Sequence, residues 1–359
     1  MKTKINKKSL AIGLAAVAVA LSVSCSEQNT GNVPVMTLDH TVKDTANTLI
    51  SEDLNFNIPI YAQKIYICED SIAVVCNKNS EWFLELYNLN ENRLLKNFLR
   101  RGNGPGEMLD VNFFFNNDTI TVEDFQKDRI AVIPIHDAVY DDSYKPELSP
   151  LSVLSQYKLP YKGRLLALNP YCFINKEYSI NNDGPRFIVS DSNYVYKETE
   201  SYKYQTYNVS YSSFFISFAN DRIVYVCEKE PVLELYDTNL NPIKQIFGPE
   251  MQSRQKYMIE ENGNVCFLNT IPYAYSSFCY NDNFFYVCYN GNFLSYKNDF
   301  DTSVLKSWIF KFDWDGNFID SYYIDHYVKS MSLSNDGRYI YAFGTDREGE
   351  NVFYKYLLR

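Results

Sequence analysis

The sequence predicts an all-β fold assembled from one repeated four-stranded unit. The chain of 359 residues contains 31 Tyr and 24 Phe, and aromatic residues favour strands. Two short apolar runs joined by a polar turn, with a third run behind them, recur six times at a spacing of about 50 residues. Four strands at that period are typical of a propeller blade. We therefore predict a six-bladed β-propeller with four-stranded antiparallel blades.

Each unit is expected to begin with a strand pair. The six pairs are Ile65–Cys76, Phe113–Val122, Leu165–Ile174, Phe215–Cys227, Phe278–Cys288 and Met331–Phe343. Third strands are expected at Phe83–Tyr87, Arg129–Ile135, Arg186–Val189, Val232–Tyr236, Ser307–Phe312 and Val352–Leu357, and fourth strands at Leu94–Leu99, Ile243–Phe247 and Phe318–Ile324. The sixth unit reaches Arg359 without a fourth strand. Because an open edge invites aggregation, we expect a segment between Val33 and Phe56 to close the ring beside Val352–Leu357.

The clearest unit contains a glycine-rich turn. It runs Gly102-x-Gly104-Pro105-Gly106-Glu107, and the strands Ile120–Asp124 and Arg129–Val132 follow it. This unit resembles an NHL repeat. From Ile58 to Arg359 the chain resembles the lipoproteins of Bacteroidota that form six-bladed, TolB-like propellers. The resemblance implies the fold, a location in the cell envelope and a binding role.

The N-terminus has the pattern of a secretion signal. Met1–Ser9 carries four lysines, and Leu10–Leu21 is an apolar run too short to span a bilayer. Small residues then precede Cys25, and this pattern resembles a lipobox, which implies lipidation of that cysteine. The alternative is ordinary signal cleavage, with Cys25 playing no part in it. We expect residues 1–24 to be a signal peptide, 25–48 a lipidated tether and 49–359 the propeller. The predicted location is the outer membrane, with its periplasmic or surface side left open.

Charge restricts the partners. The formal net charge is −10, and loss of the four leader lysines lowers it to −14. Such a surface repels nucleic acid and anionic lipid, so membrane contact is expected through the anchor only. We expect a monomer with a protein or glycan partner.

Signatures of catalysis are sparse. The three histidines are far apart in sequence and show no metal-ligand spacing, and neither a G-x-S-x-G nucleophile motif nor a phosphate-binding loop occurs. We therefore predict no catalytic residue set, no metal site and no cofactor. Asp124 and Arg129 flank one turn and are expected to form a cross-strand charge pair.

Three cysteines recur near the end of the second strand of their units: Cys76, Cys227 and Cys288. Equivalent positions in different blades lie beyond disulfide reach, so they are interpreted as small buried side chains. The best disulfide candidate is Cys279 with Cys288, on adjacent strands.

Three unusual connections are expected on one face of the propeller: Gly102–Gly106, Met251–Ser277 and Tyr289–Val304. In a four-stranded blade, the fourth-to-first and second-to-third connections emerge together. The predicted binding residues on this face are Arg101, Glu107, Tyr257, Tyr273, Tyr275, Tyr289 and Tyr296. The alternative is that the tyrosines pack the insertions against the blades.

Three functions remain open from the sequence. The first is a non-catalytic lipoprotein that binds a partner through its propeller. The second is a calcium-dependent hydrolase or lyase, as in some six-bladed lactonases. The third is a purely structural component of an assembly.

Overall fold

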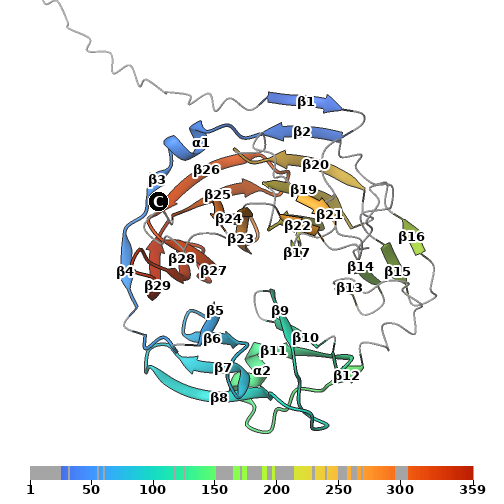
Figure 1. Ribbon diagram of the computed structural model, residues 1–359, viewed down its shortest axis with the longest axis vertical. Coiled ribbons are helices and arrows are strands. Elements are labelled where there is room, and N and C mark those ends of the chain that lie inside the picture. The colour runs from blue at the N-terminus through green and yellow to red at the C-terminus, as the bar shows by residue number, and fades with distance from the viewer. Residues whose placement is uncertain are drawn as a thin grey trace, which may run out of the picture.

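The protein is a β-propeller whose sheets are arranged radially around a central axis (Figure 1). The computed structural model describes residues 26–30, 33–54, 56–59, 61–116, 119–124, 126–150, 165–169, 172–175, 188–191, 196–198, 214–228, 231–238, 241–249, 257–259, 265–267, 270–295 and 306–358. Within these residues, no helix is long and apolar enough to cross a membrane.

The blades are antiparallel sheets of consecutive strands, ordered from the axis outward. They consist of β5 (Ala62–Cys68), β6 (Ile72–Asn77), β7 (Trp82–Asn88) and β8 (Arg93–Arg100); β9 (Val111–Asn116), β10 (Thr119–Asp124), β11 (Arg129–Pro134) and β12 (Ser149–Pro150); β13 (Leu165–Asn169), β14 (Cys172–Asn175), β15 (Ile188–Asp191) and β16 (Tyr196–Glu198); β17 (Phe214–Ala219), β18 (Arg222–Cys227), β19 (Val232–Asp237) and β20 (Pro242–Phe247); β23 (Thr270–Tyr280), β24 (Phe284–Ser295), β25 (Ser307–Asp313) and β26 (Phe318–Ile324); and β27 (Tyr327–Leu333), β28 (Tyr339–Thr345) and β29 (Asn351–Leu357). A separate two-stranded sheet pairs β21 (Tyr257–Ile259) with β22 (Val265–Phe267).

The predicted strand pairs, third strands and fourth strands fall on strands of these sheets, except that Ile135 lies in a helix and that residues 186 and 187 lie outside the described residues. Tight turns join the first two strands, as the Asn and Asp residues indicate. Glu69 and Asp70 have φ of 53° and 56°, and Asn220 and Asp221 have φ of 51° and 56°. Two successive residues with positive φ suit the right-handed twist of a hairpin, and Asn and Asp tolerate that conformation better than most side chains.

Several short elements were absent from the prediction. The strands β12 and β16 have two and three residues, too few to give an alternating pattern. The helix α2 (Ile135–Tyr140) begins at Ile135, where a strand is predicted, and its buried Ile135 and Ala138 belong to the core shared by the β5–β8 and β9–β12 blades.

The segment 33–53 wraps the outside of the propeller, and we name it the N-terminal belt (Figure 1). Its strand β2 (Val33–Thr37) pairs in parallel with β20, β3 (Asn47–Thr48) pairs in parallel with β26, and β4 (Ser51–Asp53) pairs antiparallel with β29. Between β2 and β3 lies the short helix α1 (Thr41–Asp44). Ahead of the belt, β1 (Ser26–Thr30) forms a hairpin with β2.

The belt differs from the tether expected for residues 25–48. Leu38 and Val42 are completely buried in the core around β20 and β26. Buried apolar side chains and edge pairing explain why this mostly polar stretch lies against the blades. The edge strands β20, β26 and β29 offer unpaired backbone groups, and the belt covers them.

Serine side chains link the innermost strands of neighbouring blades. Ser330 Oγ accepts a hydrogen bond from Ile65 N at 3.0 Å and donates one to Ile65 O at 2.9 Å, and Ser332 Oγ accepts from Ile67 N at 2.8 Å. One blade earlier, Ser277 Oγ accepts from Met331 N at 2.8 Å. Inner strands of different blades share no ladder, so these hydroxyls satisfy backbone groups that burial would otherwise leave unpaired.

The predicted buried thiols are confirmed. Cys76, Cys227 and Cys288 are fully buried, and burial raises the pKa of Cys76 to about 12. The suggested disulfide between Cys279 and Cys288 is not formed, since both are free thiols. Its physical obstacle is register: Cys288 lies opposite Ser277, and Cys279 lies opposite Tyr286.

Candidate functional site

The glycine-rich turn joins β8 to β9 and closes on itself. Gly102 N donates to Met108 O at 2.8 Å, and Met108 N donates to Arg100 O at 3.0 Å. The side chain of Met108 is completely buried in the core shared by the β5–β8 and β9–β12 blades. The turn is thus fixed at its base by a backbone clasp and an apolar anchor.

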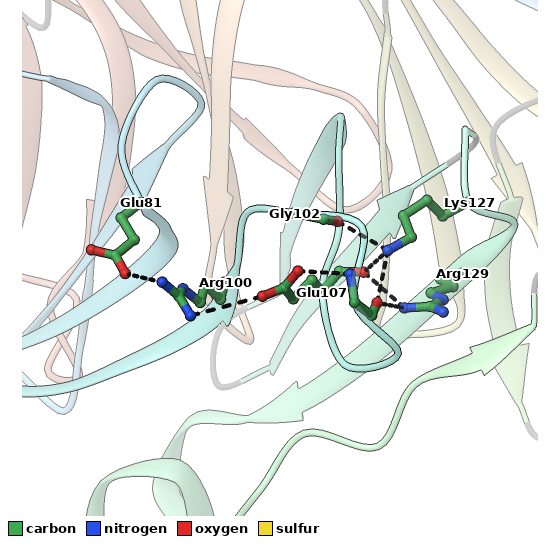
Figure 2. Close-up of polar contacts among 7 residues, drawn as sticks. Glu81, Arg100, Gly102, Glu107, Lys127 and Arg129 are labelled. Atoms are coloured by element: carbon green, nitrogen blue, oxygen red, sulfur yellow. Dashed lines mark hydrogen bonds and ion pairs between the residues drawn. The ribbon is translucent and has the colours of Figure 1, made fainter.

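Two cations from the neighbouring β10–β11 connection hold the inside of the turn (Figure 2). Lys127 Nζ donates to the carbonyls of Gly102, Gly104 and Glu107 at 2.9, 2.9 and 2.8 Å. Arg129 Nη1 donates to the carbonyls of Gly104 and Glu107 at 3.2 and 2.8 Å. Because three carbonyl oxygens converge there, the inside of the turn has a negative electrostatic potential that a cation stabilises.

Glu107 explains why glycine occupies this turn. Its carboxylate folds back and accepts a hydrogen bond from Gly104 N at 2.7 Å. A Cβ on Gly102 would lie 2.1 Å from Glu107 Oε2, and one on Gly104 would lie 2.9 Å from it. On its outer side, Glu107 faces Arg100 at 3.9 Å, and Arg100 pairs with Glu81 at 2.9 Å (Figure 2). The Glu107 carboxylate, which the sequence predicts to be a binding group, therefore forms its hydrogen bond and ion pair within the turn itself.

Asp124 and Arg129 occupy paired positions on β10 and β11, but they do not act as the expected charge pair. Asp124 is fully buried, and its carboxylate accepts from the backbone N–H groups of Leu109, Gln126 and Lys127 at 2.5, 2.9 and 3.1 Å. Arg129 donates to carbonyls of the turn. Each side chain forms hydrogen bonds with backbone groups. The two residues therefore stabilise the glycine-rich turn and the β10–β11 connection and do not pair with each other.

Arg101 is the cation that the turn presents outward. Its backbone N donates to Glu81 O at 2.8 Å, which fixes the main chain. Its exposed guanidinium lies 5.8 Å from the centre of the Phe83 ring and forms no ion pair with a carboxylate among the described residues. A guanidinium held by a rigid backbone and an aromatic ring is suited to a carboxylate of a partner.

Two of the predicted binding tyrosines are core residues. Tyr275 and Tyr289 are 0% and 1% exposed, and their ring centres lie 5.2 Å apart between the β17–β20 and β23–β26 blades. Strand extends into both expected insertions, because β23, with 11 residues, covers the end of the first and β24, with 12, covers the start of the second, so both tyrosines remain within the blade. The alternative, in which the tyrosines pack the insertions against the blades, holds for this pair.

The other predicted tyrosines are placed only in part. Tyr257 lies on β21 and Tyr273 on β23, opposite Asn292, but their side chains lie outside the described part of the structure. Tyr296 lies outside the described residues altogether. Thr270 pairs with Ser295, so the segments that precede β23 and follow β24 leave the blade from the same end.

Lys127 and Glu81 are residues of this site that the sequence prediction missed. Lys127 stands three places after Asp124, whose carboxylate fixes its backbone, and that spacing was the available signal. Elsewhere, no group of three or more His, Cys, Asp or Glu side chains in the described residues is arranged to hold a metal ion.

Comparison with known proteins places the chain by fold. Residues 39–336 match the model of a family described as TolB-like 6-blade propeller-like, which confirms the resemblance drawn from the sequence. The structure is similar to a member of the DUF4221 family from Bacteroides vulgatus, with a TM-score of 0.51, 10% identity and coverage of 86% of this chain and 97% of that one. It is also similar to an inferred exported protein from Bacteroides fragilis, with a TM-score of 0.49, 13% identity and coverage of 87% and 94%. At these identities the likeness concerns the fold alone. No curated protein matches the chain in sequence.

Proposed function

The chain belongs to the TolB-like 6-blade propeller-like family, and from this premise we propose that it is a lipid-anchored envelope protein whose propeller binds a protein or glycan partner without catalysis. We further propose that the ring has six blades and that β4 completes the last of them. The pairing of β4 with β29 supports this closure, since β4 lies along the outer edge of that blade.

Arg101 carries the proposal for binding. The turn around it is cross-linked by Lys127, Arg129 and Glu107, so little conformational entropy is lost when a partner docks. Of the four cations at this site, Arg100 pairs with Glu81 and Glu107, and Lys127 and Arg129 donate to the turn, whereas the exposed Arg101 forms no ion pair with a carboxylate among the described residues. Acidic side chains of a protein or the acid groups of a glycan would complement it.

The test is capture of partners from detergent-solubilised membranes by the full-length protein. Arg101→Glu should reduce the yield of the captured partner about tenfold or more, because central arginines are frequent hot spots. Arg93→Glu is the matched control, since Arg93 is exposed, pairs with Glu91 and starts β8 at the end remote from the turn. Equal capture by wild type, Arg101→Glu and Arg93→Glu would refute the assignment of this face.

The anchor is tested separately. Cys25→Ala should move the protein from the membrane fraction to the soluble fraction, because a lipid attached to that cysteine is the proposed membrane contact. Retention of the variant in the membrane fraction would contradict lipidation and leave the binding test unaffected.

A further inference from the structure

A second candidate site lies at the other end of the propeller from the glycine-rich turn. A cavity of about 590 Å³ opens there, where β5, β23 and β27 end and their hairpin turns begin. Phe115 at the end of β9 and His136 on α2 complete the wall. The glycine-rich turn instead leads into the start of β9, so the two sites face opposite ways along the axis. A volume of this size suits a small organic ligand.

The cavity is acidic. Its described lining residues include the carboxylates Glu69 and Asp282, and none of them is Lys or Arg. Asp282 stands exposed in its turn, and Glu69 keeps one oxygen, Oε2, in a 2.8 Å hydrogen bond from Tyr140 Oη. The neighbouring β5–β6 turn adds Asp70 beside Glu69, whereas Asp336 on the β27–β28 turn is paired with Arg338. The resulting field attracts positive charge.

The cavity is also aromatic, and its rings are held in place from behind. Phe115 stacks on Tyr66 with 4.4 Å between ring centres, and Tyr280 packs edge-on against Trp314 at 5.7 Å. Phe278 stacks on Phe285 at 5.8 Å. Phe115, Phe278 and Tyr280 are only partly buried, and each lines the cavity. Carboxylates next to fixed aromatic faces are the combination that recognises an organic cation.

His136 and two amides complete the chemistry. The exposed imidazole of His136 packs against the Tyr140 ring with 4.8 Å between ring centres. Asn281 and Asn335 lie on the two hairpin turns opposite. Asn281 Oδ1 already accepts from the backbone N–H groups of Asn283 and Phe284 at 3.0 and 2.9 Å, so acceptance of the N–H donors of an ammonium or guanidinium rests on the two carboxylates and the Asn335 amide.

We propose that this cavity, with Glu69, Asp282 and the three rings, binds the ammonium or guanidinium group of an organic cation. The charged group lies against the two carboxylates, and the methylene stem covers Phe115 and Phe278. The cation is either a free small amine or the basic side chain of a partner peptide. This site is separate from the face proposed around Arg101, so either assignment stands without the other.

Calorimetric titration of the full protein tests the proposal with three probes. Agmatine represents a free amine with a guanidinium, acetyl-Gly-Arg-Gly-amide represents a peptide side chain, and the same peptide with citrulline in place of arginine is the neutral control. We expect at least one cationic probe to bind, with affinity that falls as salt is added, and the citrulline peptide to bind at least about tenfold more weakly. Binding of agmatine alone indicates a free amine, and tighter binding of the arginine peptide indicates a partner side chain.

Two conservative variants locate the site. Glu69→Gln keeps a group that can accept from Tyr140, and Asp282→Asn keeps the shape of an exposed turn residue, so both should fold with unchanged circular dichroism and melting temperature. Each should weaken the cationic probe about tenfold. Asp110→Asn, at an exposed carboxylate beside the start of β9 and so at the opposite end of that strand from the cavity, should leave affinity unchanged. Equal affinity for the arginine and citrulline peptides, wild-type affinity in both cavity variants, or failure of both cationic probes to bind overturns the proposal.

Discussion

Acidification should weaken the fold through one buried imidazole, that of His326. The residue is 2% exposed and lies between β26 and β27, against the rings of Tyr354 and Tyr356. Its Nδ1 lies 3.2 Å from Tyr356 Oη, and its Nε2 is buried without a hydrogen-bond partner among the described residues. Burial lowers the pKa of His326 from 6.5 to about 4, although the nearby Asp325 carboxylate acts in the opposite direction.

The direction in which pH changes the free energy of unfolding depends on which state, folded or unfolded, binds the proton. Above pH 6.5 the imidazole is neutral in both the folded and the unfolded chain, so it does not change the free energy of unfolding. Between pH 6.5 and about 4 the unfolded chain takes up a proton and the folded chain does not. The free energy of unfolding therefore falls as pH falls. At about 1.4 kcal/mol per pH unit, the loss across this window is about 3 kcal/mol.

Urea unfolding of wild type and His326→Gln across this pH window measures the effect. The glutamine retains a polar group for Tyr356 and has no proton to bind, and shared carboxylate effects cancel in the difference between the two proteins. We expect wild type to be the more stable at neutral pH and its advantage to shrink by about 3 kcal/mol near pH 4. A difference that stays constant with pH would show that His326 is not the titrating group.

Three further predictions concern packing. Gly344→Ala should cost several kcal/mol, since its Cβ would lie 1.9 Å from Tyr327 O, whereas Gly106→Ala has nothing within 4 Å and should leave the melting temperature unchanged; similar melting of the two variants would contradict this. Lys127→Met should cost about 2 kcal/mol and speed proteolytic cleavage of the glycine-rich turn, and an unchanged cleavage rate would show that the three carbonyl contacts are dispensable. Tyr289→Ala should cost about 3–5 kcal/mol in urea unfolding because its ring is core, and a stable variant would restore the surface interpretation.

The strand order was predictable because it rests on local signals. Short apolar runs and turns such as Asn220-Asp221 indicate each hairpin without reference to the rest of the chain. The roles of side chains were less accessible. Tyr275 and Tyr289 were assigned to loops because composition cannot tell a long strand from a strand followed by an aromatic loop.

Contacts between distant segments were beyond local patterns. The burial of Leu38 and Val42 depends on β20 and β26, which follow about 200 residues later or more. The role of Lys127 depends on carbonyls of another connection, and carbonyl positions leave no mark on residue type. Likewise, the residues that line the acidic, aromatic cavity come from separate blades, so no contiguous stretch of sequence predicts it.

The N-terminal belt has a consequence for the order in which the chain acquires its structure. Its strands leave the ribosome first, yet β2, β3 and β4 must wait for β20, β26 and β29. The partner strands β20, β26 and β29 are synthesised in the same order as β2, β3 and β4. The belt strands can therefore pair with the growing propeller one blade at a time. Its last pairing joins residues 51–53 to residues 354–356 of β29. Closure of so long a loop makes the final blade slow to form, and a chain that stops before β29 keeps β4 as an unpaired edge.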